Sequence, residues 1–466
     1  MESPDLVLKL VRDYVNDYTS LLQGMLNAHQ SATFTMPLGN YPVSSLKVPV
    51  GLTLNVPTGA TIQALAMPKV GNDSIALLTL SSRSRLEGDG VIDGNRFQRK
   101  HGSAVLIAGQ ANGVSVSGVR IVEAAEQGIQ VVGSRGIVID SVSVSGCGIP
   151  GTTDQYQAIN LVISSDVEVR RCNLSDAQHG VQWWGDETNG LCENIIIYKN
   201  EIRDVTGGAW GHLGKNVSVV RNKIKRCKDV GVDFETTFDS ESIGNEVSNC
   251  LNHALSVFNG SKNILFRGDK VNQEQEWGGG IGLYGPVANT GIRFEGGSIQ
   301  TFGAAGQGLG TVGSGVASKV TLTGYSIEVN HPSAMPIRVL DANRFYIVEN
   351  PLIAGYHSIG VSLEGSSDSV VKGNLLRNMN PTSGSKGVFL YWRGAQHPTK
   401  RTVVEENRLE GYEQIADDCW GDNNSCNVIR DNEVAQVTHR GTSSYTGIIQ
   451  NNKTLAGSPS VVSVIS

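Results

Sequence analysis

Two carboxylates in the middle of the chain, Asp233 and Glu235, have a spacing that suits acid and base chemistry. They lie in the segment GVDFETTFD (231–239), in which apolar and polar residues alternate. If this segment is a β-strand, both side chains point to the same side, with their Cα atoms about 6.5 to 7 Å apart. Hydrolysis of a glycosidic bond uses two carboxyl groups, which inverting enzymes hold about 6.5 to 9.5 Å apart. The spacing therefore leans toward an inverting pair in which either residue is the general acid.

Neighbouring segments carry aromatic and polar residues that would line a groove beside this pair. The segments GVQWWGDE (180–187), GAWGHLG (208–214), ALSVFNG (254–260) and GIGLYG (280–285) also read as strands. If they belong to adjacent coils, about 4.8 Å apart, the groove is on the order of 20 Å long. Aromatic side chains in it would offer flat faces to sugar rings. The predicted substrate-binding residues are Gln182, Trp184, Asp186, Glu187, Trp210, His212, Ser256, Phe258 and Tyr284.

Each of these residues also has a purely structural interpretation. A carboxylate pair on an outward strand is usually a solvated face. Trp184 and Trp210 could equally lie in a subunit interface, where tryptophan is enriched. A single histidine such as His212 more often makes a structural hydrogen bond than performs catalysis. The coincidence of all these residues on one strip is what favours a binding site.

A repeat along the chain provides the elements that would position this strip. Segments such as VSVSGVRI (114–121), IIIYKNEI (195–202) and VSVVRNKI (217–224) alternate in polarity and end in a turn, at intervals of roughly 20 to 33 residues. Such a period predicts an all-β solenoid of about fifteen coils, in which each coil is buried against its neighbours. The recurring turn position is asparagine at Asn200, Asn222, Asn245, Asn350, Asn374, Asn407, Asn432 and Asn452.

Asparagine has a physical reason to recur at this turn. Its side chain tolerates the left-handed backbone conformation and can satisfy a backbone group, and stacked amides can bond to one another from coil to coil. Five residues further on stands a column of small apolar residues, which we expect to be interior: Ala124, Cys147, Ala177, Val205, Cys227 and Cys250.

The seven cysteines are best interpreted as free thiols. Their number is odd, and their spacings match neither a zinc site nor a disulfide framework. A free cysteine packs like a small apolar residue, so core packing is the simplest role. Cys419 and Cys426 are close enough in sequence to pair, but nothing else in the sequence favours a bridge. The residues require no metal and no cofactor.

The two ends of the chain differ from the repeat. Residues 1–30 carry Leu8, Val11, Val15, Tyr18 and Leu22 at three- and four-residue spacing, which predicts an amphipathic helix that caps the first coil. We expect the β-helix to span residues 31–455. The apolar tail, residues 456–466, would cap the far end or enter an oligomer contact.

Composition excludes several classes of partner. Lys and Arg number 38 against 44 Asp and Glu, so no basic surface predicts a nucleic-acid partner. No apolar run approaches the roughly 20 residues needed to cross a bilayer, which predicts no membrane insertion. The opening residues also lack the basic and apolar regions of a secretion signal.

The coil repeat with its N-x-[IVL] turns, and the opening helix followed by FTMPLGNYPVSSLKVPVGLTLNVPTGATIQ (34–63), resemble the pectate-lyase-like superfamily. More narrowly, the chain resembles tailspike and capsule-depolymerase proteins of tailed bacteriophages. The resemblance implies a single-stranded, right-handed parallel β-helix that forms a homotrimer and cleaves bacterial surface polysaccharide, with Asp233 and Glu235 as acid and base. It also implies a place in the virion tail if a phage encodes the chain, and an extracellular location otherwise.

Some motifs of the wider superfamily are missing. The segment GAWGHLG offers Gly211 and His212 without the Gly-His-Gly element of polygalacturonases, Asp417-Asp418 lies far along the chain, and the pectate-lyase calcium site has no counterpart.

Three functions stay open at this point. The first is an endo-glycosidase. The second is a polysaccharide lyase or uronate epimerase with His212 or Tyr284 as base, and the third is a solenoid that binds glycan without cleaving it. The predicted groove contains few basic residues to neutralise a uronate, which favours hydrolysis.

Overall fold

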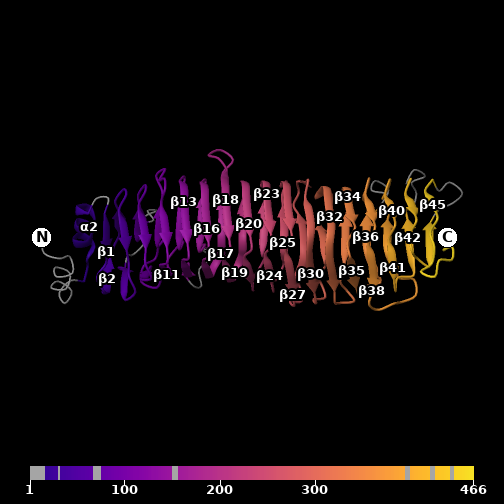
Figure 1. The fold of residues 1–466 in the computed structure, drawn as a ribbon, viewed down its shortest axis with the longest axis horizontal. Helices are drawn as coiled ribbons and strands as arrows, with labels where there is room; N and C mark the ends of the chain where they lie inside the picture. The colour runs from indigo at the N-terminus through magenta and orange to yellow at the C-terminus, as the bar shows by residue number, and fades with distance from the viewer. Residues whose placement is uncertain are drawn as a thin grey trace. The chain divides into compact units, whose positions relative to one another are not determined.

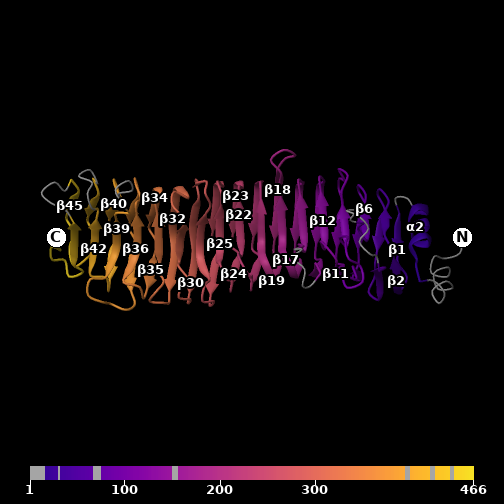
Figure 2. The same cartoon turned by 180° about the vertical axis from the view of Figure 1, so that it is seen from behind.

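The computed structural model describes residues 16–29, 32–66, 75–149, 156–393, 399–419, 426–440 and 446–465. Its fold is an all-β parallel solenoid of about 14 turns with one short N-terminal helix, which confirms the predicted fold class (Figure 1). Strands of successive coils lie side by side, as the view from behind also shows (Figure 2). Residue contacts group the chain into two compact units, 1–224 and 225–466, and the strands within each are described below.

In the first unit each coil adds one strand to each of three sheets. The long strand β17 (Asn173–Trp184) serves two sheets, because its first half pairs with β14 (Ser143–Cys147) and its second half with β15 (Ile159–Val162). β19 (Glu201–His212) pairs with β17 along its whole length. The remaining sheet continues through β13 (Arg135–Asp140), β16 (Ser165–Arg170), β18 (Cys192–Tyr198) and β20 (Gly214–Val220).

The second unit repeats this arrangement. One sheet contains β22 (Val232–Glu235), β25 (His253–Phe258) and β28 (Gly279–Tyr284), paired in that order. Another contains β26 (Lys262–Arg267), β30 (Arg293–Thr301), β32 (Ala317–Val329) and β34 (Asn343–Val348). Alternation places the apolar side chains inside, where Phe266 and Phe294 stack with ring centroids 4.9 Å apart.

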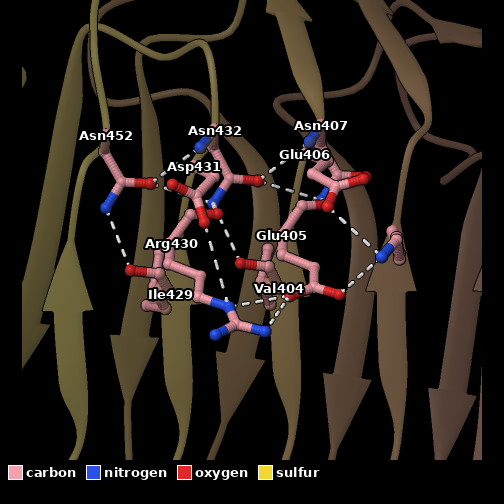
Figure 3. Close-up of polar contacts among 10 residues, drawn as sticks. Val404, Glu405, Glu406, Asn407, Ile429, Arg430, Asp431, Asn432 and Asn452 are labelled. Carbon is pink, nitrogen blue, oxygen red and sulfur yellow. Dashed lines mark hydrogen bonds and ion pairs between the residues drawn. The ribbon is translucent and has the colours of Figure 1, made fainter.

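A ladder of buried asparagine amides connects the coils at one turn of the solenoid. In the second unit the Nδ2 of Asn350, Asn374, Asn407 and Asn432 each donates to the Oδ1 of the next asparagine, the last being Asn452, over 2.8 to 3.0 Å. Figure 3 shows the last three members in a row. The predicted bonding from coil to coil is therefore confirmed.

The left-handed conformation lies one residue earlier than the sequence suggested. Glu349, Glu406, Asp431 and Asn451 have φ of 53 to 56°, whereas the ladder asparagines that follow them are not among the residues with positive φ. The preceding residue makes the sharp bend, and this leaves the asparagine side chain directed inward, where its amide can reach the neighbouring coil. The expectation that the ladder residue itself adopts the left-handed region was wrong.

The predicted interior column is mostly buried. Ala124, Val205, Cys227 and Cys250 are essentially inaccessible, whereas Ala177 is partly exposed. All seven cysteines are free, six of them buried and Cys426 exposed. Within the described parts of the chain, no group of three or more His, Cys, Asp and Glu side chains is arranged to hold a metal ion.

The described part of the predicted capping helix is α2 (Thr19–Ala28), and residues 1–15 of that prediction lie outside the described residues. Leu22 and Leu26 are buried, and the Gln23 side chain bonds both backbone groups of Lys47 in β3 (Leu46–Val48), over 2.8 and 2.9 Å. Residues 461–465 of the predicted tail form β46, which pairs in parallel with β44 (Gln436–Arg440). Among the described residues, no helix is long and apolar enough to cross a bilayer.

The ladder predicts a large penalty for losing one of its amides. We expect Asn407→Ala to lower the unfolding free energy by about 2 to 4 kcal/mol, because buried donors and acceptors lose their partners. Asn407 Nδ2 also donates to the carbonyl oxygens of Val371 and Glu405. Urea midpoints would measure the effect against Asn40→Ala, an exposed asparagine bonded only to a side chain, that of Gln63. Equal midpoints for the two variants would contradict a stabilising ladder.

Candidate functional site

In the first unit, the predicted aromatic residues lie on the outward faces of β17 and β19. Gln182 is opposite Trp210, and Trp184 is opposite His212. Trp184 is 41% exposed, whereas Gln182 is only 7% exposed. The open part of this face is therefore formed by the rings rather than by the amide.

His179, which the sequence did not single out, completes an aromatic stack on this face. Trp210 lies between His179 and Trp184, with ring centroids 4.6 and 5.6 Å apart, and Trp184 also packs against His212 at 5.1 Å. Gly207 makes room for the imidazole, because a Cβ at that position would lie 2.5 Å from His179 Cδ2. We call these four rings the aromatic platform.

In the second unit, the carboxylate pair lies on the outward face of β22. Asp233 is opposite Ser256, and Glu235 is opposite Phe258, which is itself opposite Tyr284. Glu235, Phe258 and Tyr284 are partly exposed, whereas Asp233 and Ser256 are 7% and 1% exposed. The sequence predicts that Gln182, Asp233 and Ser256 line the groove, but all three side chains are buried.

A polar network borders the carboxylate pair. Asn252 Nδ2 donates to Asp229 Oδ1 over 3.0 Å, so its Oδ1 faces the other way, where it accepts the hydroxyl of Tyr284 over 2.8 Å. The Nδ1 of His253 lies 2.9 Å from the same oxygen and also contacts the Tyr284 hydroxyl. The four residues Asp229, Asn252, His253 and Tyr284 thus form one bonded network, which we call the tyrosine network.

Electrostatics keeps this network in a defined protonation state. Burial raises the pKa of Tyr284 well above its usual value, and the carboxylates of Asp233 and Asp229 raise it further. Burial lowers the pKa of His253 to about 4, because its ring packs against Gly279 and Gly282. At neutral pH the phenol therefore keeps its proton and the imidazole is uncharged.

Asp186 and Glu187 lie beyond the end of β17. The Asp186 carboxylate accepts the backbone N–H groups of Asn189 and Thr188 over 2.8 and 2.9 Å, and these bonds lower its pKa. It therefore shapes a tight turn, and Glu187 is exposed beside it. A substrate contact by either residue stays a prediction.

The predicted strip divides between the two units, and its continuity from one to the other stays a prediction. Sequence reasoning missed His179, His253, Asn252 and Asp229. The available signal was the glycine opposite each histidine, Gly207 for His179 and Gly279 for His253, since a missing side chain in a parallel stack leaves space for a ring.

Known proteins are similar to this chain in fold. A family model described as a right handed beta helix region matches residues 153–299. Similar solved structures include a polygalacturonase from Erwinia carotovora, with 17% identity and a TM-score of 0.43 over 69% of this chain and 90% of that one. The DFA-IIIase of Arthrobacter chlorophenolicus in complex with GF2 has 9% identity and a TM-score of 0.49, over 71% and 90%.

A third similar structure is the surface adhesin PfbA of Streptococcus pneumoniae, with 11% identity and a TM-score of 0.40 over 93% of this chain and 92% of that one. The comparison with curated proteins gives no match. The predicted right-handed β-helix is confirmed, and the narrower resemblance to phage tailspikes stays a prediction.

The two buried histidines predict a loss of stability in weak acid. Burial lowers the pKa values of His179 and His253 from 6.5 to about 4, so the unfolded chain binds more protons between these two values. Each histidine therefore removes up to about 1.4 kcal/mol of stability per pH unit as the pH falls from 6.5 to 4. Denaturant midpoints across this range would measure the slope.

His179→Phe is the matched test, because it keeps a ring against Trp210 and removes the titrating group. We expect a shallower acid slope in this variant than in the wild type. An unchanged slope in His179→Phe would show that the His179 imidazole is not held neutral by burial.

Proposed function

We propose that the chain is a polysaccharide-degrading enzyme in which Asp233 and Glu235 hydrolyse a glycosidic bond. The observation that carries this proposal is the placement of both carboxylates on the outward face of one strand, β22. Their i and i+2 spacing suits a general acid and a general base with a water between them and the sugar. Glu235 reaches the surface, whereas Asp233 is buried opposite Ser256.

The surroundings of the pair favour hydrolysis over elimination. A lyase or epimerase needs a strong base, and a cation to neutralise the uronate carboxylate. None of the strands β22, β25 and β28 contains Lys or Arg. The raised pKa of Tyr284 makes its phenolate scarce, and the lowered pKa of His253 makes its imidazole a weak base.

Aromatic side chains would hold the substrate. The apolar C–H face of a sugar ring packs well on an aromatic face. In the first unit the aromatic platform offers such faces. In the second unit the rings of Phe258 and Tyr284 lie 5.9 Å apart beside the carboxylates.

We further propose, from the resemblance to phage depolymerases, that the substrate is a bacterial surface polysaccharide cut within its chain. A homotrimer, and a location in the virion tail or outside the cell, belong to the same proposal.

A glycan-binding solenoid without catalysis is the second candidate. The burial of Asp233 favours it, because a carboxylate that the substrate cannot touch cannot transfer a proton to it. In that case the aromatic platform and Glu235 would bind sugar. The wild type would show no cleavage, so substituting the carboxylates would change no rate.

Product analysis distinguishes these functions. We expect the wild type to release reducing ends, without the ultraviolet absorbance of an unsaturated uronate, from at least one member of a panel of capsular and O-antigen polysaccharides. Glu235→Gln should lower the rate by at least about a hundredfold, since positioned acid or base catalysis contributes this much. Asp233→Asn should do the same.

Glu274→Gln is the matched control for these variants, because Glu274 is an exposed residue just beyond β27 (Lys270–Gln273) whose carboxylate accepts a 3.3 Å bond from Asn272 Nδ2. It should retain full activity. Ultraviolet absorbance in the products would overturn hydrolysis in favour of elimination, and a fully active Glu235→Gln would remove this residue from the site.

The aromatic platform predicts a binding defect separate from catalysis. Trp184→Ala should weaken substrate binding by roughly threefold to tenfold, the amount expected from losing one aromatic face, and leave kcat nearly unchanged. Trp277→Ala, which removes a more exposed tryptophan outside the platform, serves as the control. A fall in kcat with unchanged KM in Trp184→Ala would contradict a role in binding.

A further inference from the structure

A hollow of about 620 Å³ lies on the outer surface of another sheet of the second unit, away from the carboxylate pair. It lies over β26, β30, β32 and β34 and beside the short strand β29 (Asn289–Thr290). This volume falls within the roughly 300 to 1,000 Å³ that is usual for a ligand pocket. The hollow is lined by Asn263, Gly291, Arg293, Lys319, Thr321, Arg344 and Tyr346.

Small residues between larger ones create the hollow. Thr321 stands in register between Arg293 on one neighbouring strand and Tyr346 on the other, so the long side chains flank a short one. Gly291 has a left-handed backbone with φ of 72°, and a Cβ there would lie 2.8 Å from Asn263 Oδ1. The space is therefore part of the stacking pattern.

The charges around the hollow break the pattern followed elsewhere. Lys319 and Arg344 both have left-handed backbones and lie opposite each other, because their neighbours Ser318 and Asn343 are in register. Like charges placed opposite each other on neighbouring strands are destabilising. At equivalent left-handed positions of other coils the partners are complementary: Asn263 donates to Asp239, and Arg401 donates to Asp368.

Nearby carboxylates compensate these cations only in part. Asp368 is held by two bonds from Arg401, at 2.6 and 2.7 Å, and Arg344 acts on it only through a longer-range attraction that lowers the Asp368 pKa. Glu295 is held by Arg267 at 2.7 Å and lies 3.4 Å from Arg293. Among the described residues, no ion pair joins Lys319 or Arg344 to a carboxylate. A chain with a net charge of −6 thus keeps excess positive charge at one hollow.

We propose that this hollow binds the anionic group of an acidic glycan. The carboxylate, sulfate or phosphate would lie between Lys319 and Arg344, where it relieves their repulsion and accepts charge-assisted hydrogen bonds. The ring of Tyr346 would pack against the sugar, and Asn263 and Thr321 would bond its hydroxyl groups. This site does not include Asp233 or Glu235, so a test of it is independent of a test of the proposed hydrolysis.

Direct binding of defined oligosaccharides to the full chain tests the proposal. Calorimetric titration would compare an oligogalacturonate, a sulfated oligosaccharide and a neutral oligosaccharide of equal length, with inorganic phosphate as a fourth probe. We expect at least one acidic sugar to bind, more weakly as salt is raised. The double variant Lys319→Gln/Arg344→Gln should weaken its binding by about tenfold or more, the loss expected for two charge-assisted bonds.

The matched control is Lys228→Gln/Lys270→Gln, which removes the same charge from exposed lysines of the same unit outside the hollow. Thr321→Trp keeps the charge and fills the space, so it should also abolish binding. The double variant should be at least as thermally stable as the wild type, because it removes a like-charge contact. No binding of any acidic sugar, equal binding of the neutral sugar, or an equal loss in the control would overturn the proposal. Binding of free phosphate alone would also overturn the glycan assignment.

Discussion

Parallel stacking places each side chain of a coil directly against its counterpart in the next, about 4.8 Å away. A column of such positions is stable when neighbouring members bond to or pack on one another. Asparagine satisfies this at the turn, because its amide donates on one side and accepts on the other, as Asn374 and Asn407 do. Inside, Phe266 and Phe294 satisfy it by stacking. The columns, rather than any single coil, are the units that hold this fold together.

The same stacking constraint determines which side chains lie next to one another on the outer faces. Rings in register produce the aromatic platform, and complementary charges in register produce ion pairs such as Arg430 with Glu405 (Figure 3). Positions that break the constraint are informative, since a column of like charges gains nothing from stacking. Lys319 and Arg344 break it with only partial compensation, and for that reason we assign a ligand to them. Glu235 lies beside the aromatic column of Phe258 and Tyr284 instead of a basic one.

The sequence predicts the features that follow from the repeat, but it does not predict which outward side chains are buried by packing. The coil period and the amide ladder follow from the Asn column, because few other side chains can both donate and accept in a stack. Alternation correctly places Trp184 and Glu235 outward, but it says nothing about which outward residue is covered. Gln182 and Ser256 are buried although they lie on the same outward faces as the exposed rings. The ring of His253 lies toward the neighbouring strand β28, where Gly279 and Gly282 leave space for it.

The source of the oxygen at the new chain end tests the proposed hydrolysis most directly. Cleavage in heavy-oxygen water, followed by mass spectrometry and by proton NMR of the fresh product, measures this together with the anomeric configuration. We predict one labelled oxygen on each new reducing end and an inverted anomeric centre, because the separation of Asp233 and Glu235 leaves room for a water. Products without the label would contradict hydrolysis, and a retained configuration would contradict this carboxylate pair as acid and base.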